Sequence, residues 1–132
     1  MSDLWDRVVM RPLGYAVPEI VGNLTPEQFA DISNGCGPAS AKVDLVPDGF
    51  AGVRFTEVCN DHDAAYHFGA DEDDKRKADR MLLDGLLAAV DARYPEDGIE
   101  QTALRYACRK VAFEYYLAVA GWGHDAFWAG KD

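Results

Sequence analysis

Apolar residues recur at helical spacing through most of the second half of the chain. This pattern predicts a helix that is capped by Thr56 and ended by Gly69, a second from Asp71 to about Tyr94, and a third from about Ile99 to Ala120. Thr-Pro-Glu-Gln at residues 25–28 is a capping signature with proline at the first helical position, which predicts a shorter helix through about Ile32. Residues 41–54 show no such periodicity and are expected to be irregular.

These elements predict a mostly α fold. The short link around Gly69 and Ala70 is expected to pack the first two long helices antiparallel, with the other helices packed around them. With 132 residues, of which 48% are hydrophobic, the chain is long enough to bury a sizeable core, and no Ser/Gly/Pro-rich linker divides it. Residues 1–132 are therefore expected to form a single domain.

The helix that begins at Thr56 carries a histidine, His62, on its apolar face. On a wheel of about 100° per residue, five apolar residues lie within about 60° of it. They are Phe55, Val58, Cys59, Ala65 and Tyr66. Because a buried imidazole must be hydrogen-bonded, a helix that only packs would carry an aliphatic residue at position 62. His62 is thus a candidate catalytic base, and the alternative is a histidine that is satisfied within the core.

The second long helix carries a carboxylate, Asp79, at the centre of its apolar stripe. The stripe lies within about 60° of Asp79 on the wheel. It consists of Leu82, Leu83, Leu86 and Val90. A buried carboxylate needs a partner, and antiparallel packing would bring Asp79 against His62, where it would fix the tautomer and stabilise the imidazolium. The alternative is a salt bridge from Asp79 to Arg105 or Arg109 of the third helix.

Three stretches of the chain combine into one pattern. The first long helix contains Cys-x-x-His-Asp-x-x-Tyr, formed by Cys59, His62, Asp63 and Tyr66. The second long helix contains Asp79 followed by Arg80, and an upstream glycine-rich turn reads Asn-Gly-Cys-Gly-Pro-Ala-Ser at residues 34–40. This pattern resembles the phospholipase A2 superfamily of calcium-dependent lipases, in particular its small, disulfide-poor members from microbes and their viruses.

The resemblance implies a calcium site beside His62. Calcium is a hard cation that takes oxygen ligands, so a carboxylate and the carbonyls of a tight turn suit it. By resemblance, the ligands are the carboxylate of Asp63 and the carbonyl oxygens of Gly35, Gly37 and Ala39, with waters completing the shell. In the family, the metal polarises the sn-2 ester carbonyl of a glycerophospholipid and holds the developing oxyanion.

The resemblance also implies the catalytic roles. His62 would deprotonate the attacking water, Asp79 would orient His62, and Tyr66 would donate a hydrogen bond to the buried Asp79. No covalent intermediate is needed. For Tyr66 the alternative is an ordinary core aromatic residue.

Three cysteines are present in the chain. The resemblance implies a disulfide between Cys36 and Cys59, which fall where the family joins its calcium loop to the catalytic helix. Cys108 lies on the apolar face of the third helix and is expected to be a small, reduced, buried residue. That face also contains Leu104, Val111, Ala112 and Tyr115.

The net charge of the chain limits the kinds of partner that it can be expected to bind. At a net charge of −10, with residues 75–77 as the only basic run, the chain is not expected to bind nucleic acid. The acidic residues 71–74 before that run are expected to complement the helix macrodipole and to pair with the basic residues beyond them. The resemblance implies a phospholipid substrate, and the acidity of the chain weakens adsorption to anionic membranes. Zwitterionic phospholipid, either as monomers or at a transient membrane or micelle surface, is therefore expected.

Targeting signals give little further information. The N-terminus has no basic start followed by an apolar run, so no signal peptide is recognised, and no stretch approaches about 20 apolar residues. No transmembrane segment is therefore expected, and the compartment is left open. A reducing cytosol would keep a bridge between Cys36 and Cys59 open.

Two alternatives to a phospholipase remain. A non-catalytic calcium-binding or structural module on the same scaffold is favoured by the missing signal peptide and by Pro38 and Ala39, which replace glycines of the family's loop. The other is a zinc site, since thiolate and imidazole suit that metal. Its ligands would be Cys36, Cys59, His62 and His67. Against it, His67 points about 140° away from His62 on the wheel.

Overall fold

A computed structural model describes residues 2–32 and 49–131. The elements, in chain order, are β1 (Val8–Met10), β2 (Ala16–Pro18), α1 (Glu19–Gly22), α2 (Pro26–Ile32), β3 (Gly49–Phe50), β4 (Val53–Arg54), α3 (Thr56–Phe68), α4 (Glu72–Arg93), α5 (Ile99–Trp122) and α6 (His124–Trp128). The described part of the chain is mostly helical, as the apolar periodicity predicts. The three long helices begin and end within about two residues of the predicted positions. The cap predicted at Thr56 is wrong, because Thr56 is the first residue of α3 and Phe55, in the cap position, accepts no side-chain capping bond.

The predicted starts of α2 and α4 are visible in their hydrogen bonds. The amide of Gln28 donates to Thr25 Oγ1 at 3.1 Å, and the amide of Thr25 donates to Gln28 Oε1 at 3.0 Å, which is a reciprocal capping box at the start of α2. Asp71 caps α4 by accepting from the amide of Asp74 at 2.8 Å. Polar side chains therefore satisfy backbone donors at the start of both helices.

Two small hairpins were not predicted. In the first, β1 pairs antiparallel with β2, with Val9 opposite Val17. In the second, residues 49–54 were expected to be irregular, but β3 pairs with β4 across a two-residue turn. Ala51 (φ 52°) and Gly52 (φ 83°) both adopt positive φ there, as a type I′ turn requires. Alanine rarely adopts positive φ, so Ala-Gly carries no turn signal in the sequence.

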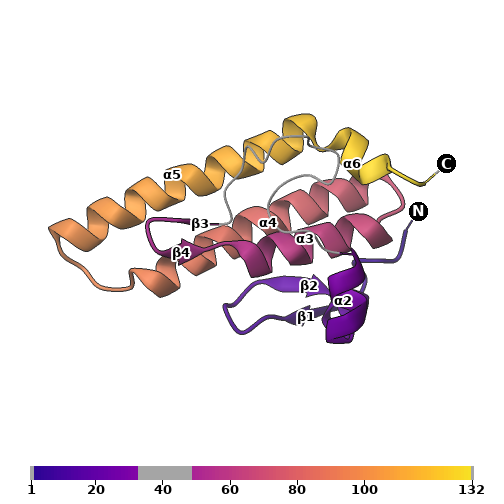
Figure 1. The fold of residues 1–132 in the computed structure, drawn as a ribbon, viewed down its shortest axis with the longest axis horizontal. Helices are drawn as coiled ribbons and strands as arrows, with labels where there is room; N and C mark the ends of the chain where they lie inside the picture. Colours follow the sequence, from indigo (N-terminus) through magenta and orange to yellow (C-terminus); the bar gives the residue numbers. More distant parts are fainter. Residues whose placement is uncertain (1, 33–48, 132) are drawn as a thin grey trace.

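The long helices lie side by side, with α4 between α3 and α5 (Figure 1). The chain reverses direction from α3 to α4 and again from α4 to α5. The β1–β2 hairpin lies beside α3 with α1 and α2, and α6 packs at the end of α5 and against α3. This arrangement leaves α3 covered by α4 on one side and by the N-terminal elements on another.

The core of the described residues is one apolar cluster that draws on every long helix. Its largest fully buried side chains include Phe55, Phe127, Leu82 and Leu86. The faces predicted around His62 and Asp79 are buried, and so are Cys108, Ala112 and Tyr115 of α5. Leu104 lies on the same face of α5, one turn before Cys108, but it is 39% exposed. None of the helices within residues 2–32 and 49–131 combines the length and apolarity that crossing a bilayer requires.

The α3 and α4 helices pack closely against each other at Gly85. A Cβ atom at this position would lie 2.4 Å from Cγ1 of Val58 on α3. Valine has little rotamer freedom in a helix, so Val58 could not easily turn away. Gly85 therefore sets the spacing at which residues of α3 and α4 meet.

We expect Gly85→Ala to destabilise the protein by about 1–3 kcal/mol, because the added methyl overpacks the α3–α4 contact. Gly121→Ala in α5 is the matched control, since nothing lies within 4 Å of a Cβ there. In a helix, this exchange is otherwise stabilising by roughly 0.5–1 kcal/mol. Chemical denaturation measures both effects. Equal stability of the two variants would contradict the close packing at Gly85.

Candidate active site

The site forms where His62 of α3 meets Asp79 of α4. Both side chains are buried in the core, with exposed fractions of 6% and 3%. Nε2 of His62 lies 2.8 Å from Oδ1 of Asp79. The two residues are seventeen positions apart in sequence, and the reversal of the chain between α3 and α4 brings them together.

Two further donors complete the environment of Asp79. Tyr66 donates its hydroxyl to Oδ1 at 2.5 Å, and Lys75 donates its ammonium to Oδ2 at 2.8 Å. Burial alone would raise the pKa of Asp79, but the bonds and charge from His62, with the bonds from Lys75 and Tyr66, outweigh it. The pKa of this carboxyl is held below its ordinary value. Asp79 is therefore an anion at neutral pH.

The ionised carboxylate determines the tautomer of His62. A carboxylate only accepts hydrogen bonds, so neutral His62 carries its proton on Nε2 and has a free lone pair on Nδ1. No described residue is hydrogen-bonded to Nδ1. The His62 ring lies against Tyr66, with ring centroids 4.1 Å apart at 47°. His62 is thus oriented from two sides and retains one basic nitrogen.

Lys75 was missed by sequence reasoning, which placed it in a solvated run of charges. Its neighbours in that run behave as expected, since Arg76 and Lys77 pair with Asp73 at the surface. Lys75 is instead buried, at 6% exposure. Besides Asp79 it contacts the carbonyl oxygen of Val119 on α5, at 3.2 Å. The i, i+4 spacing between Lys75 and Asp79 was the available signal.

The alternative partners proposed for Asp79 are wrong. Arg109 pairs with Asp91 at 2.7 Å on the surface. Arg105 donates to the carbonyl oxygen of Tyr94 at 2.7 Å. Neither arginine reaches the buried stripe of α4, because both lie on the half of α5 that is remote from the site and Lys75 already neutralises the carboxylate from within α4.

Tyr66 is held by the C-terminal segment. Its ring meets Phe127 of α6 edge to face, with centroids 5.1 Å apart, and Lys131 donates to its backbone carbonyl. A Cβ atom at Gly123 would lie 2.6 Å from the Tyr66 hydroxyl oxygen, so only glycine leaves room there. Burial and the neighbouring Asp79 charge raise the pKa of Tyr66, which keeps the phenol protonated as a donor.

The predicted metal ligands are only partly described. Asp63 is half-buried on α3, directly after His62, and is engaged with other groups of the protein. Gly35, Gly37 and Ala39 lie outside the described residues. Within residues 2–32 and 49–131, no group of three or more His, Cys, Asp or Glu side chains is arranged to hold a metal ion. The donor that is described, one carboxylate, suits an oxygen-preferring cation completed by backbone carbonyls.

The state of the cysteines bears on the zinc alternative. Cys59 is disulfide-bonded, so it has no thiolate to offer, and the zinc alternative loses a ligand. The bridge predicted from Cys36 to Cys59 stays a prediction, because Cys36 lies outside the described residues. Cys108 is a free, buried thiol, as expected, and burial raises its pKa.

A further buried carboxylate, Asp61 of α3, was not predicted. Asp61 is 2% exposed and accepts two hydrogen bonds from Arg11, at 2.6 and 3.0 Å, and one from the hydroxyl of Tyr15, at 2.5 Å. Its partners lie about fifty residues away in the unpredicted β1–β2 hairpin, so spacing within the sequence gave no signal. Asp61, Arg11 and Tyr15 thus form one hydrogen-bonded cluster in which Arg11 and Tyr15 donate and Asp61 accepts. This cluster fixes the N-terminal hairpin to α3, next to the site.

We expect Asp79→Asn to destabilise the protein by about 3–5 kcal/mol at pH 7, because it leaves Lys75 buried without a counter-charge. The pKa of Asp79 is lower in the folded protein than its ordinary value near 4. The ionised carboxylate therefore contributes its full stabilisation of the fold above about pH 4, and this contribution is lost as the pH falls through the lower pKa of the folded state. The difference in free energy of unfolding between wild type and variant should therefore shrink below about pH 4.

Asp91→Asn, which breaks a surface pair, is the control and should cost under about 1 kcal/mol. A pH-independent difference for Asp79→Asn would contradict the ionised carboxylate.

No protein-family model, curated protein or solved structure matches this chain.

Proposed function

We propose that this protein is a calcium-dependent, phospholipase A2-like hydrolase that cleaves the sn-2 ester of glycerophospholipids. The observation that carries the proposal is the 2.8 Å contact between His62 Nε2 and the Asp79 carboxylate, which leaves Nδ1 as a basic nitrogen. Asp63 follows His62 directly on α3 and provides an oxygen ligand beside that base. Base, orienting carboxylate and metal ligand thus come from two neighbouring helices.

In the proposed reaction, Nδ1 of His62 takes a proton from a water molecule as the water oxygen attacks the ester carbonyl. The same proton then passes to the leaving oxygen of the lysophospholipid. The positive charge that His62 acquires in between lies against the Asp79 carboxylate, which stabilises it. The nucleophile is water, so the protein needs no side chain that forms a covalent intermediate.

Lys75 and Tyr66 act through Asp79. Both donate to its carboxylate, so Asp79 stays ionised in a buried setting where an isolated carboxyl would tend to protonate. An ionised Asp79 holds the His62 proton on Nε2 and keeps Nδ1 free in each cycle. These two residues are therefore positioning residues in the proposal.

Asp63 would hold the calcium ion, with loop carbonyls of Gly35, Gly37 and Ala39 as the further ligands expected from the resemblance. Calcium, when bound, supplies the positive charge that polarises the ester carbonyl and stabilises the oxyanion. Asp63 directly follows His62, so one helix, α3, would hold both the base and the carboxylate ligand.

We expect His62→Gln to lower the rate of sn-2 hydrolysis of a short-chain phosphatidylcholine by at least about 10²-fold, because a general base is lost. The assay compares calcium with chelator. His67→Gln is the matched control, since His67 is an exposed histidine on the same helix, and it should retain wild-type activity. Hydrolysis that survives in folded His62→Gln would remove the assigned base. Calcium binding by the wild type without any hydrolysis would instead select the non-catalytic calcium-binding module.

We expect Asp63→Asn to weaken calcium binding, measured by calorimetry, by about tenfold or more, because a neutral amide replaces the charged oxygen ligand. Asp84→Asn serves as control, since Asp84 is an exposed carboxylate of α4 paired with Arg80. Its calcium affinity should equal that of the wild type. An unchanged affinity in Asp63→Asn would move the metal site elsewhere.

A further inference from the structure

The α5 helix has apolar residues on two opposite faces. One face packs into the core through Cys108, Ala112 and Tyr115. On the other, Ile99, Tyr106 and Phe113 recur at intervals of seven residues, with exposed fractions of 91%, 75% and 48%. A helix at the edge of a domain needs only the first of these faces.

The outer face has the spacing of a coiled-coil seam. Ala103, Lys110 and Leu117 are also seven residues apart, and each lies four residues after a member of the first series and three before the next. In a heptad, the step from d to the next a is four residues and the step from a to d is three. The first series therefore takes d positions and the second series takes a positions, over three repeats. Ala103 and Lys110 are exposed, and so is Leu117, at 65%. We call these six residues, Ile99, Ala103, Tyr106, Lys110, Phe113 and Leu117, the outer seam.

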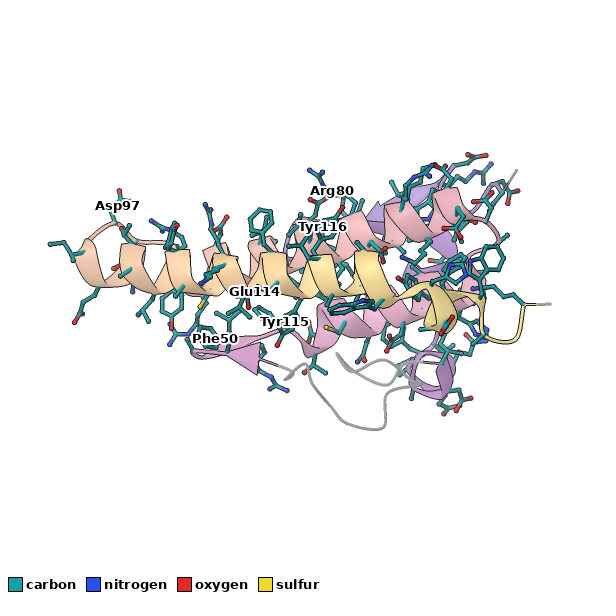
Figure 2. All side chains as sticks on the ribbon, turned by 90° about the horizontal axis from the view of Figure 1, so that it is seen from above. Phe50, Arg80, Asp97, Glu114, Tyr115 and Tyr116 are labelled. Carbon is teal, nitrogen blue, oxygen red and sulfur yellow. The ribbon has the colours of Figure 1, made fainter. Side chains whose placement is uncertain are left out.

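No described element covers the outer seam. In Figure 1, α5 runs along the edge of the molecule on the side away from α3. Figure 2 looks down on that edge, and α5 lies uncovered across the view from the Asp97 end to α6. Single exposed apolar residues are normal on a protein surface, but a periodic row along a 24-residue helix marks an interaction site.

We propose that the outer seam pairs with the same seam of a second copy of this chain, in an antiparallel arrangement. In an antiparallel pair, a positions pack against d positions of the other helix. This places Tyr106 opposite Leu117 of the second copy, and Lys110 opposite Phe113. Because the axis is two-fold, each of these contacts occurs twice.

Charge selects the antiparallel direction. A parallel pair would place Lys110 against Lys110, whereas the antiparallel pair places it next to Glu114 of the second copy. Glu114 directly follows Phe113 at the flank of the seam, and neither Glu114 nor Lys110 forms an ion pair with any residue that the structure describes. Lysine at a single a position is a known device for fixing register in coiled coils. The opposite charges of Lys110 and Glu114 are thus brought together by the antiparallel pairing in the proposed register.

The size of the seam indicates a concentration-dependent dimer. A helix of 24 residues is about 36 Å long. In this register Tyr106, Phe113 and Leu117 of each copy face the partner seam, whereas Ile99 lies beyond the paired stretch. These side chains would bury less than about 1,200 Å², the lower end of the range for specific interfaces, so the dimer is expected to be weak. The inference does not depend on the proposed hydrolase, since it rests on α5 alone.

The test uses the full chain in sedimentation experiments over a concentration series at about 0.15 M salt, where distant charges are screened. The wild type should dimerise. Lys110→Glu and Glu114→Lys should each weaken dimerisation by at least about tenfold, because each places like charges opposite one another. An equimolar mixture of the two variants should regain wild-type affinity, since each copy then supplies the charge that the other lacks.

Lys77→Glu is the matched control, because Lys77 is an exposed lysine of α4 away from the seam, and it should dimerise like the wild type. Circular dichroism verifies that all variants are folded. A wild type that is monomeric throughout the series would overturn the proposal. So would single variants that dimerise like the wild type, or a mixture no tighter than its components.

Discussion

The buried carboxylate of Asp79 is the group on which the rest of the structure depends. An isolated charge in a protein core costs several kcal/mol of solvation free energy. Three donors offset this cost, and they come from His62 and Tyr66 on α3 and Lys75 on α4. The helices must therefore meet in one register, because a shift of one turn would take His62 and Tyr66 away from Asp79 and leave the buried carboxylate with Lys75 as its one donor among these three.

The remaining elements also help to hold the partners of Asp79 in place. Lys75 also contacts a carbonyl of α5, and Tyr66 is held by Phe127 of α6 and by the narrow space at Gly123. On the other side of α3, Asp61 fixes the N-terminal hairpin. The base of the proposed reaction is thus supported by regular elements rather than by loops, which keeps its orientation constant between turnovers.

Local periodicity in the sequence was enough to predict the long helices and to reveal His62 and Asp79 as polar residues on buried faces. Prediction failed where structure depends on distant partners or on unusual backbone angles. Asp61 pairs with residues about fifty positions away, and Ala51 adopts a positive φ that its sequence does not signal. The burial of Lys75 was not predicted, because charged residues surround it in the sequence, although its i, i+4 spacing to Asp79 was informative.

The central claim is that Asp79 keeps the proton of neutral His62 on Nε2 and leaves Nδ1 free to act as a base. Nitrogen-15 NMR of the imidazole rings at neutral pH reports this directly, with His62→Gln used to assign the signal and the exposed His67 and His124 as internal references. The account predicts that His62 is a single tautomer with a protonated Nε2 and an unprotonated Nδ1. A His62 that carries its proton on Nδ1, or that exchanges between tautomers like the exposed histidines, would contradict it.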